Sequence, residues 1–502
     1  MKRKREVPVK SEVENPLQIS PLRRLERLAN SPASESEALI HEGQKYSYSQ
    51  LAEQVENRRY RLEQLLEQSD SSHLPLIVDR SLESYLTVLT CLVYELPFAL
   101  IDADSPLARI RALLGLLHSP RAAWWPINFH LGGGVAEIVR SSDLHTSHFP
   151  SDSFVVTTSG STGEPKGVEL GFDHQRIRLN DELEEEGMDP SRQTTTMLPL
   201  HFVAGLNRVA RMLLGGTLHV YDHNQMTITE LLQSFRDTRI THLHLPAQLG
   251  RLIGQFGNAR RIQLPEVRFL RLGGEGTRYE TLQGIRKITG DDVVFHSRLG
   301  ATEGNRAFAH RMTLGAIKEA GPVPVGLPTS RAQLVATDGH GEGVFELRVV
   351  GLIARGYINQ PELTAERFGT TQDGQRFWKS GDLVRLEDDG LYYHFGRSDD
   401  VVKVRGMLAS PSEATRVLLG IPEIRTAITL PVAHRGSTRL ISHVEVPADS
   451  SIQMSDLVSA LERELPSHLR PSLIQIHQAI PTTSRGKIDR AALNEWAKVN
   501  LT

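Results

Sequence analysis

The feature that most constrains the fold of this chain is the alternation of two apolar patterns along its N-terminal part. Short apolar runs such as LPLIVD (74–79) and PFALID (97–102) stand between segments with apolar residues at helical spacing, such as YRLEQLLEQ (60–68) and LARIRALLGLLHS (107–119). The short runs are typical of buried strands, and the helical spacing is typical of helices that cover a sheet. This alternation predicts an α/β fold built on doubly wound sheets.

The pattern changes twice further along the chain. Strand-like runs continue through SDSFVVTTSG (151–160) and VRFLRLGGEG (267–276), but from about Gly326 β-like stretches such as VFELRVVG (344–351) dominate. After GRSDDVVKVRGM (396–407) both patterns return over about a hundred residues, enough for an independent domain. We expect a disordered leader (1–20), a large N-terminal domain (21–398) that includes a small β-barrel-like lobe, and a small mobile α+β C-terminal domain (399–502).

The charge balance and the cysteine content exclude several classes of protein. The chain carries 57 Lys and Arg against 60 Asp and Glu, and a net charge of −3 provides no field that would gather nucleic acid or an anionic membrane. Cys91 is the only cysteine, which rules out an intramolecular disulfide and fits a reducing cytoplasm. No apolar stretch reaches the ~18 residues of a membrane span. We expect a cytoplasmic protein with no nucleic-acid or membrane partner.

A glycine-rich hydroxyl loop is the first candidate for a functional site. TTSGSTGEPKG (157–167) follows the apolar run SFVV (153–156). Such loops can wrap backbone N–H groups and small hydroxyls around phosphate oxygens, although an ordinary solvated turn has a similar composition. Because Lys166 stands between Pro165 and Gly167, the loop is not a Walker loop.

Two histidines form a weaker candidate. His242 and His244 of ITHLHLP (240–246) would lie on one face of a strand, where they could share a metal ion. No third ligand is near in sequence, so a strand that tolerates two histidines is the favoured interpretation.

Seven segments together resemble one family. They are TTSGSTGEPKG (157–167), LPLHFVAGLN (198–207), LRLGGEG (270–276), RLGATEGN (298–305), FWKSGDL (377–383), GRSDDVVKVRG (396–406) and PTTSRGKIDR (481–490). Their order and rough spacing resemble the adenylate-forming superfamily, which includes acyl-CoA synthetases, nonribosomal peptide synthetase adenylation domains and firefly luciferase. The resemblance runs from about Leu51 to the C-terminus, and seven segments in order are hard to reach by chance.

The resemblance implies an AMP-forming ligase that depends on ATP and Mg²⁺. A carboxylate would attack the α-phosphate of ATP to give an acyl-adenylate and pyrophosphate, and a second nucleophile would then take the acyl group. In-line attack of one anion on another needs the triphosphate charge neutralised and the reacting oxygens held in line.

The resemblance also implies which residues hold the nucleotide. The phosphate loop would comprise Thr158, Ser159, Gly160, Ser161, Thr162, Gly163 and Lys166. Thr302 and the Mg²⁺ ligand Glu303 would act at the α-phosphate, since Mg²⁺ accepts a carboxylate together with phosphate oxygens. Gly274, Glu275, Leu299 and Gly300 would line the adenine and acyl pockets. Asp382 would clamp the ribose, with Arg397 in support.

The C-terminal segments would supply the mobile part of the mechanism. Lys487 resembles the lysine that the family places between the attacking carboxylate and the α-phosphate, where a cation stabilises the transition state. Asp399 resembles the hinge between the two half-reactions. Gly406 would line the tunnel for an incoming thiol.

Departures from the family pattern bear on the acid. Leu299 stands where the family often has a Tyr that stacks on adenine, and the usual PLFH is inverted to His201 then Phe202. Val203 follows Phe202 where amino-acid-activating domains carry an Asp, and a buried ammonium without a carboxylate would be costly. This favours an acid without an α-amino group. The expected substrate pocket comprises His201, Phe202, Gly205, Arg298 and Asn305.

The acceptor remains open at the level of sequence. Because the chain ends soon after Lys487, we expect a free-standing enzyme that loads a separate carrier protein, with coenzyme A nearly as well supported and a free amine third. The alternatives are a regulatory relative that binds nucleotide without turnover and a luciferase-like oxygenase.

Overall fold

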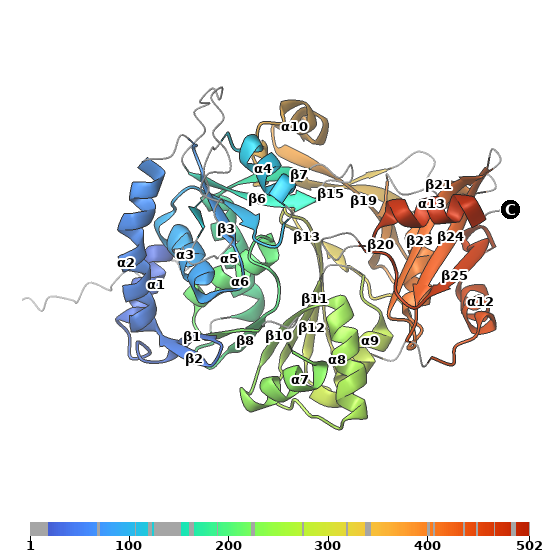
Figure 1. The fold of residues 1–502 in the computed structure, drawn as a ribbon, viewed down its shortest axis with the longest axis horizontal. Helices are drawn as coiled ribbons and strands as arrows, with labels where there is room; N and C mark the ends of the chain where they lie inside the picture. The colour runs from blue at the N-terminus through green and yellow to red at the C-terminus, as the bar shows by residue number, and fades with distance from the viewer. Residues whose placement is uncertain are drawn as a thin grey trace, which may run out of the picture.

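The fold is mixed α/β with several sheets (Figure 1). In the computed structural model, the described residues are 19–67, 71–105, 107–118, 123–124, 152–159, 165–187, 189–221, 226–273, 276–317, 320–336, 343–398, 402–404, 407–434, 437–447, 450–465, 467–482 and 488–500. The predicted leader lies mostly outside them, but Ser20 already caps the first helix by accepting a hydrogen bond from the Arg23 N–H at 3.3 Å.

A six-stranded sheet carries the predicted phosphate loop. Its order is β17-β7-β6-β4-β3-β5, with β3 to β6 parallel to one another and β7 antiparallel to both of its neighbours, β6 and β17. The strands are β3 (Leu74–Val78), β4 (Phe98–Asp102), β5 (Ala123–Trp124), β6 (Ser153–Ser159), β7 (Pro165–Gly171) and β17 (Gly356–Tyr357). β6 and β7 pair from Ser153↔Gly171 to Ser159↔Pro165, so both ends of the predicted phosphate loop lie in these two strands.

A nine-stranded sheet forms the second layer, in the order β14-β13-β12-β11-β10-β8-β9-β1-β2. The central strands β12 to β1 are parallel, and β13, β14 and β2 are antiparallel to their neighbours. The strands are β1 (Glu37–His41), β2 (Gln44–Ser47), β8 (Gln193–Thr196), β9 (Thr217–Val220), β10 (His242–Pro246), β11 (Phe269–Gly273), β12 (Val294–Gly300), β13 (Arg306–Thr313) and β14 (Leu327–Pro328).

Helices fill the space between the two sheets and cover their outer faces. One core joins α3 and α6 to strands of both sheets, so α3, α5 and α6 lie between the layers (Figure 1). The helices of this region are α1 (Pro21–Ala29), α2 (Tyr48–Glu67), α3 (Leu82–Tyr94), α4 (Leu107–Leu116), α5 (Phe172–Glu186), α6 (Val203–Arg211), α7 (Ile228–Asp237), α8 (Ala247–Ala259) and α9 (Tyr279–Thr289). Short 3₁₀ turns follow at Met212–Leu214 and Leu314–Ala316.

The central strands of the nine-stranded sheet have two different faces. Leu243, Leu245, Leu270, Leu272 and Phe295 pack in one apolar core with α8 and α9. Successive side chains of a strand point to opposite faces, so the residues between them face the other way. Those residues are His242, His244, Phe269, Arg271, His296 and Arg298. A charged face therefore backs onto α5 and α6.

The β-rich lobe expected after Gly326 is an antiparallel sheet of five strands. They are β15 (Ala332–Ala336), β16 (Val344–Val350), β18 (Phe368–Thr370), β19 (Arg376–Leu386) and β20 (Tyr392–Arg397), with α10 (Pro361–Arg367) beside them. The long strand β19 pairs with β16, β18 and β20, so it places FWKSGDL at the centre of the lobe.

The C-terminal elements have a hydrophobic core of their own. They are β21 (Val402–Val404), β22 (Met407–Ala409), α11 (Pro411–Leu419), β23 (Thr426–His434), β24 (Ser437–Glu445), α12 (Met454–Glu464), a 3₁₀ turn (Ser467–Leu469), β25 (Leu473–His477) and α13 (Arg490–Asn500). This group meets the N-terminal part through Arg251 of α8, which donates to the backbone carbonyls of Leu419 and Ile424 at 3.2 and 2.5 Å. The division at residues 398 and 399 stays a prediction.

No helix in the part of the chain that the structure describes combines the length and the apolar character that crossing a bilayer requires.

Candidate functional site

The hairpin of β6 and β7 holds Lys166 beside Tyr357 of the same sheet. Thr158 and Ser159 end β6, and Lys166 pairs with Thr158 in the hairpin register. The Lys166 ammonium nitrogen lies 5.6 Å from the centre of the Tyr357 ring, within the range of a cation–π interaction. Tyr357 stands on β17, the strand that pairs with β7. The hairpin therefore holds Lys166 against an aromatic ring that the sequence motifs do not include.

Glu303 shares this tyrosine. The Tyr357 hydroxyl donates to Glu303 Oε1 at 3.0 Å and accepts from Trp378 Nε1 at 3.3 Å. Burial raises the pKa of Glu303, against the opposing effects of the Tyr357 hydrogen bond and the charges of Lys166 and Arg397. A carboxylate held in a buried place beside two cations is able to hold a metal ion with phosphate oxygens.

Arg178 of α5 fixes the loop that carries Thr302 and Glu303. Its Nη2 atom donates to the carbonyls of Ala301 and Thr302, both at 3.0 Å, and to that of Gly304. Burial lowers the pKa of Arg178 to about 10, which still leaves it charged at neutral pH. One guanidinium thus gathers three carbonyls and sets the shape of the loop.

Asp382 and Arg397 meet in the lobe as the sequence predicts. Arg397 Nη1 lies 3.3 Å from Asp382 Oδ1, and Arg397 Nη2 donates to the Ser380 carbonyl at 3.1 Å. His394 Nε2 is also 3.3 Å from Asp382 Oδ1. Gly381 between them has φ +74°, a conformation that glycine adopts without strain. Only 15 % of the Asp382 side chain is exposed, so its orientation is set by these contacts.

The charged face of the sheet places Arg298 in a network with α5. Arg298 Nη1 donates to Glu182 Oε1 at 3.0 Å, and its Nη2 atom pairs with Glu185. Six arginines pair with three glutamates of one helix: Arg192, Arg208, Arg211, Arg271, Arg298 and Arg306 with Glu182, Glu185 and Glu186. Glu182 and Glu186 are 3 % and 0 % exposed, so these are buried ion pairs.

The network controls the protonation of its own members. Burial opposes ionisation of Glu182, yet Arg208, Arg271 and Arg298 together hold its pKa well below the ordinary value. Burial and the charge of Glu182 raise the pKa of Glu186. Burial, with nearby arginines, lowers the pKa of His242 to about 3 and that of His296 to about 4. The imidazoles are therefore neutral at pH 7 and add no charge.

The two strand histidines lie side by side as predicted and bond arginines. Arg192 Nε donates to His242 Nε2 at 3.2 Å, and Arg208 Nη1 lies 3.1 Å from His244 Nε2. Among the described residues, no three His, Cys, Asp or Glu side chains are grouped so that they could hold a metal ion.

The remaining residues of the expected substrate pocket have different surroundings. His201 Nδ1 lies 3.4 Å from Asp102 Oδ1, and its ring centre is 4.2 Å from that of Phe202, which is 36 % exposed. Asn305 is 2 % exposed, and neither atom of its amide has a partner among the described residues. A Cβ on Gly205 would lie 2.2 Å from the Pro199 carbonyl oxygen, so this glycine allows α6 to pack on the preceding loop. Leu299 pairs with Phe308 and packs against the main core.

Several predicted residues lie outside the described part of the chain. They are Gly160, Ser161, Thr162, Gly163, Gly274, Glu275, Asp399, Gly406 and Lys487. Thr158, Ser159, Gly300 and Thr302 are described in the backbone positions given by β6, β12 and the loop that Arg178 holds. The roles expected for all of these residues stay predictions.

Sequence reasoning missed Tyr357, Trp378 and Arg178. Trp378 lies inside FWKSGDL, so its proximity to Asp382 was available from the motif, but its partner Tyr357 was not. Gly356 and Tyr357 precede a Pro-initiated helix, which signals a strand followed by a helix and nothing about Glu303. Arg178 bonds residues more than a hundred positions away, and no local pattern marks such a contact.

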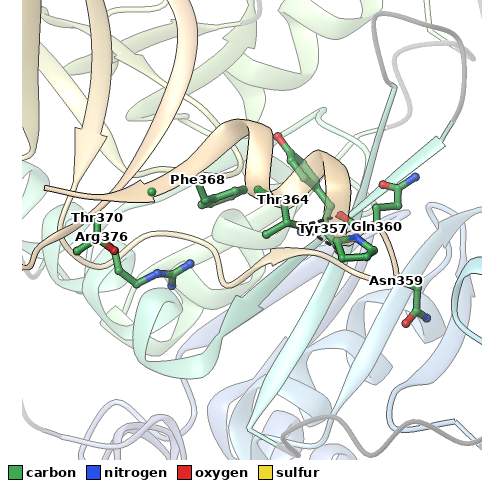
Figure 2. A pocket seen from close by; sticks show the side chains of 10 residues that line it. Tyr357, Asn359, Gln360, Thr364, Phe368, Thr370 and Arg376 are labelled. Carbon is green, nitrogen blue, oxygen red and sulfur yellow. Dashed lines mark hydrogen bonds between the residues drawn. The ribbon is translucent and has the colours of Figure 1, made fainter.

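Tyr357 also borders a cavity of about 550 Å³ beside α10 (Figure 2). Asn359, Gln360, Thr364, Phe368 and Arg376 are among its lining residues. Lys166, Glu303 and Asp382 do not line it, so this cavity is separate from the group of residues that the motifs predict.

Comparisons with known proteins agree with the fold and the motifs. The family model described as AMP-binding enzyme matches residues 142–357. Surfactin synthase subunit 2 of Bacillus subtilis (strain 168) is 30 % identical over 449 residues, which make up 83 % of this chain and 12 % of that protein. The chain thus spans about an eighth of the length of this curated relative. It belongs to the AMP-binding, adenylate-forming superfamily.

Solved structures show the same fold over nearly the whole chain. The anthranilate CoA ligase AuaEII, in complex with anthranoyl-AMP, matches with a TM-score of 0.78 and 18 % identity over 97 % of this chain and 98 % of that one. The amide bond synthetase McbA of Marinactinospora thermotolerans matches with a TM-score of 0.74 and 17 % identity over 95 % of this chain and all of that one.

Proposed function

We propose that this chain activates a carboxylic acid with ATP, forming an acyl-adenylate and releasing pyrophosphate. The observation that carries the proposal is the convergence of three motifs that are far apart in sequence. Lys166 and Glu303 meet at Tyr357, and the charge of Arg397, which pairs with Asp382, acts on Glu303. Cations, a metal-binding carboxylate and a ribose-binding carboxylate are the groups that nucleotide activation needs.

Glu303 is the proposed Mg²⁺ ligand. Tyr357 donates to Oε1, and a carboxylate has further lone pairs on its two oxygens with which it could hold a cation. The raised pKa of Glu303 fits the same role, because a divalent ion would offset the cost of ionising a buried carboxyl. Mg²⁺ would supply charge neutralisation on the triphosphate.

The proposed roles of the other residues follow from their positions. Lys166 neutralises phosphate charge at the end of the hairpin, and Arg178 keeps the Thr302 loop in one shape. Asp382, held by Arg397 and His394, accepts hydrogen bonds from ribose hydroxyls. Lys487 lies outside the described residues, and the resemblance alone gives its proposed role, which is to stabilise the charge that develops between the carboxylate and the α-phosphate.

The proposed acid has no α-amino group. Val203 opens α6 at the position where an amino-acid-activating enzyme would need a carboxylate. Arg298 lies on β12, and Asn305, whose amide has no partner among the described residues, directly precedes β13; a guanidinium repels an ammonium ion. The residues of the pocket thus favour an acid that carries no positive charge.

The proposed acceptor is a phosphopantetheine thiol, of a separate carrier protein first and of coenzyme A second. Support for a carrier protein comes from the likeness to the peptide synthase, and support for coenzyme A from the fold of the anthranilate CoA ligase. A free amine is the third candidate, because the amide bond synthetase shares the fold over the whole of its length.

Pyrophosphate release with ATP and Mg²⁺, over a panel of aryl, fatty, keto and amino acids, tests the proposal. Glu303→Gln and Lys487→Ala should each lower the rate at least about a hundredfold, because each removes charge that stabilises the transition state. The exposed Glu362→Gln on α10 serves as a matched control and should leave the rate unchanged. Hydroxylamine should trap the acyl-adenylate as a hydroxamate.

The same reaction mixtures separate the alternatives. A folded protein that binds ATP and releases no pyrophosphate with any acid would favour the regulatory reading. With an acid identified, mass spectrometry of the product formed with a carrier protein, coenzyme A or an amine names the acceptor. Oxygen uptake would reveal the oxygenase.

A further inference from the structure

The charged face of the nine-stranded sheet contains more positive than negative charge. The ion pairs of this face join six guanidinium groups to three carboxyl groups. The neighbouring Asp181 is occupied by Arg331, at 2.8 Å, and the three histidines on these strands have lowered pKa values. Buried charge without a counter-charge is costly in free energy. The excess of guanidinium groups therefore indicates that an anion binds at this face.

Some of these arginines also have N–H donors that bond no described residue. The Nε atoms of Arg271, Arg298 and Arg306 are buried and have no hydrogen-bond partner among the described residues. Both amide atoms of the buried Asn305 are likewise without a partner. Buried polar groups in folded proteins are nearly always satisfied, so a cluster of unused N–H donors indicates a ligand that supplies acceptors.

The surplus donors lie where a ligand of this sheet would lie. Arg298 stands two residues before the carboxyl end of β12, Arg271 stands in the middle of the adjacent parallel strand β11, and Arg306 opens β13 in register with Gly300. Ligands of open α/β sheets bind beyond the carboxyl ends of the strands. Asn305 and Arg306 stand two and three residues after Glu303, and Arg178 reaches from the same helix as Glu182 to the Thr302 carbonyl.

We propose that the acid activated by this protein carries a second anionic group, held by Arg298 and Arg306 with Arg271 and Asn305 in support. The inference rests on the proposed function, because it names the class of acid that the same site takes. A carboxylate is the simplest second anion, since its two oxygens can accept N–H donors from more than one guanidinium group. The reacting carboxylate would lie toward Glu303, and the second one among the arginines.

Matched pairs of acids test the proposal directly. Glutarate, adipate and isophthalate are each compared with their monoamides, which have nearly the same size and lack only the second charge. We expect the wild-type protein to favour at least one dicarboxylate over its monoamide by about tenfold to a hundredfold in kcat/KM for pyrophosphate release. Arg298→Gln and Arg306→Gln should each reduce that ratio about tenfold or more.

Arg192→Gln is the matched structural control. Arg192, which directly precedes β8, belongs to the same network. Its guanidinium donates to His242 and to the carbonyls of Glu186 and Gly187 at the end of α5. We expect this variant to unfold at a lower temperature and to keep the wild-type preference. A preference that falls equally in Arg192→Gln, or a KM for ATP that rises while the acid preference stays, would overturn the proposal.

Calorimetric titration of the same acids without ATP distinguishes this proposal from the proposed function. If no acid yields pyrophosphate but dicarboxylates bind more tightly than their monoamides, and Arg298→Gln removes the difference, adenylation fails and the anion site stands. If monoamides bind or react as well as dicarboxylates, the anion site fails, whatever the enzyme activates.

Discussion

The two faces of the nine-stranded sheet are built on the same strands and held by opposite physical means. On one face, Leu243, Leu270 and Phe295 pack with α8 and α9 in an apolar core. On the other face, Arg271 and Arg298 meet the glutamates of α5. The apolar face gains stability from the burial of apolar surface, which tolerates substitution by other hydrophobic residues of similar volume. The charged face depends on each charge having its partner, because a single deletion leaves the others buried and unpaired.

The largest effect is expected where one carboxylate serves several arginines. Glu182→Gln removes the shared partner of Arg208, Arg271 and Arg298 and should lower the free energy of unfolding by about 3 to 5 kcal/mol. Urea unfolding at pH 7 measures the change.

The exposed neighbour Glu184 provides the control on the same helix. Glu184→Gln should alter the free energy of unfolding by less than about 0.5 kcal/mol. Equal effects of the two substitutions would show that the charged face gains nothing from its pairing.

The sequence predicts the strands of the two main sheets better than it predicts the charged face of the nine-stranded sheet. The alternation of apolar patterns predicted β3, β4, β10 and β11 as strands and placed the phosphate loop after β6. The sequence motifs also paired Asp382 with Arg397. These features depend on local spacing, and local spacing is visible in a sequence.

The charged face shows why its buried ion pairs could not be predicted from the sequence. NDELEEE (180–186) has the composition of a solvated helix surface, yet Glu182 is 3 % exposed in the structure. The arginines that bury it come from α6, β11 and β12, between 26 and 116 positions away. Only the assembled sheet shows that acids on one helix pair with bases on other elements.

The pH dependence of the free energy of unfolding should distinguish the two faces of the sheet. The expected effect lies between the largest and the smallest of these predictions. The pKa of His242 is lowered to about 3, so as the pH falls below about 6.5 the unfolded chain takes up a proton that the folded chain does not. The free energy of unfolding should therefore decrease as the pH falls, by about 2 kcal/mol from this histidine between pH 7 and 5. His242→Gln should make the decrease shallower by that amount.

Phe295→Leu on the apolar face is the matched control for the titration. It should lower the stability by a similar amount at every pH, because no titrating group is removed. An unchanged slope in His242→Gln would count against neutral histidines on the charged face.

The smallest effect is expected for an ion pair outside the sheet. Arg239 and Glu266 are 2.8 Å apart, with 74 % and 44 % of their side chains exposed. Glu266→Gln should change the free energy of unfolding by about 0.5 kcal/mol or less, and added salt should remove even that. A loss comparable to that of Glu182→Gln would mean that burial does not distinguish the two pairs.

The contact between α8 and the C-terminal elements has a consequence for how the chain can vary. Arg251 supplies the side chain, while Leu419, Ile424 and Arg425 supply only main-chain oxygens. Every residue has a carbonyl, so the C-terminal segment can change its side chains at these positions and keep the contact. At this contact the constraint on sequence therefore falls on Arg251, whereas elsewhere the junction joins two side chains, those of Arg278 and Glu464, at 3.3 Å.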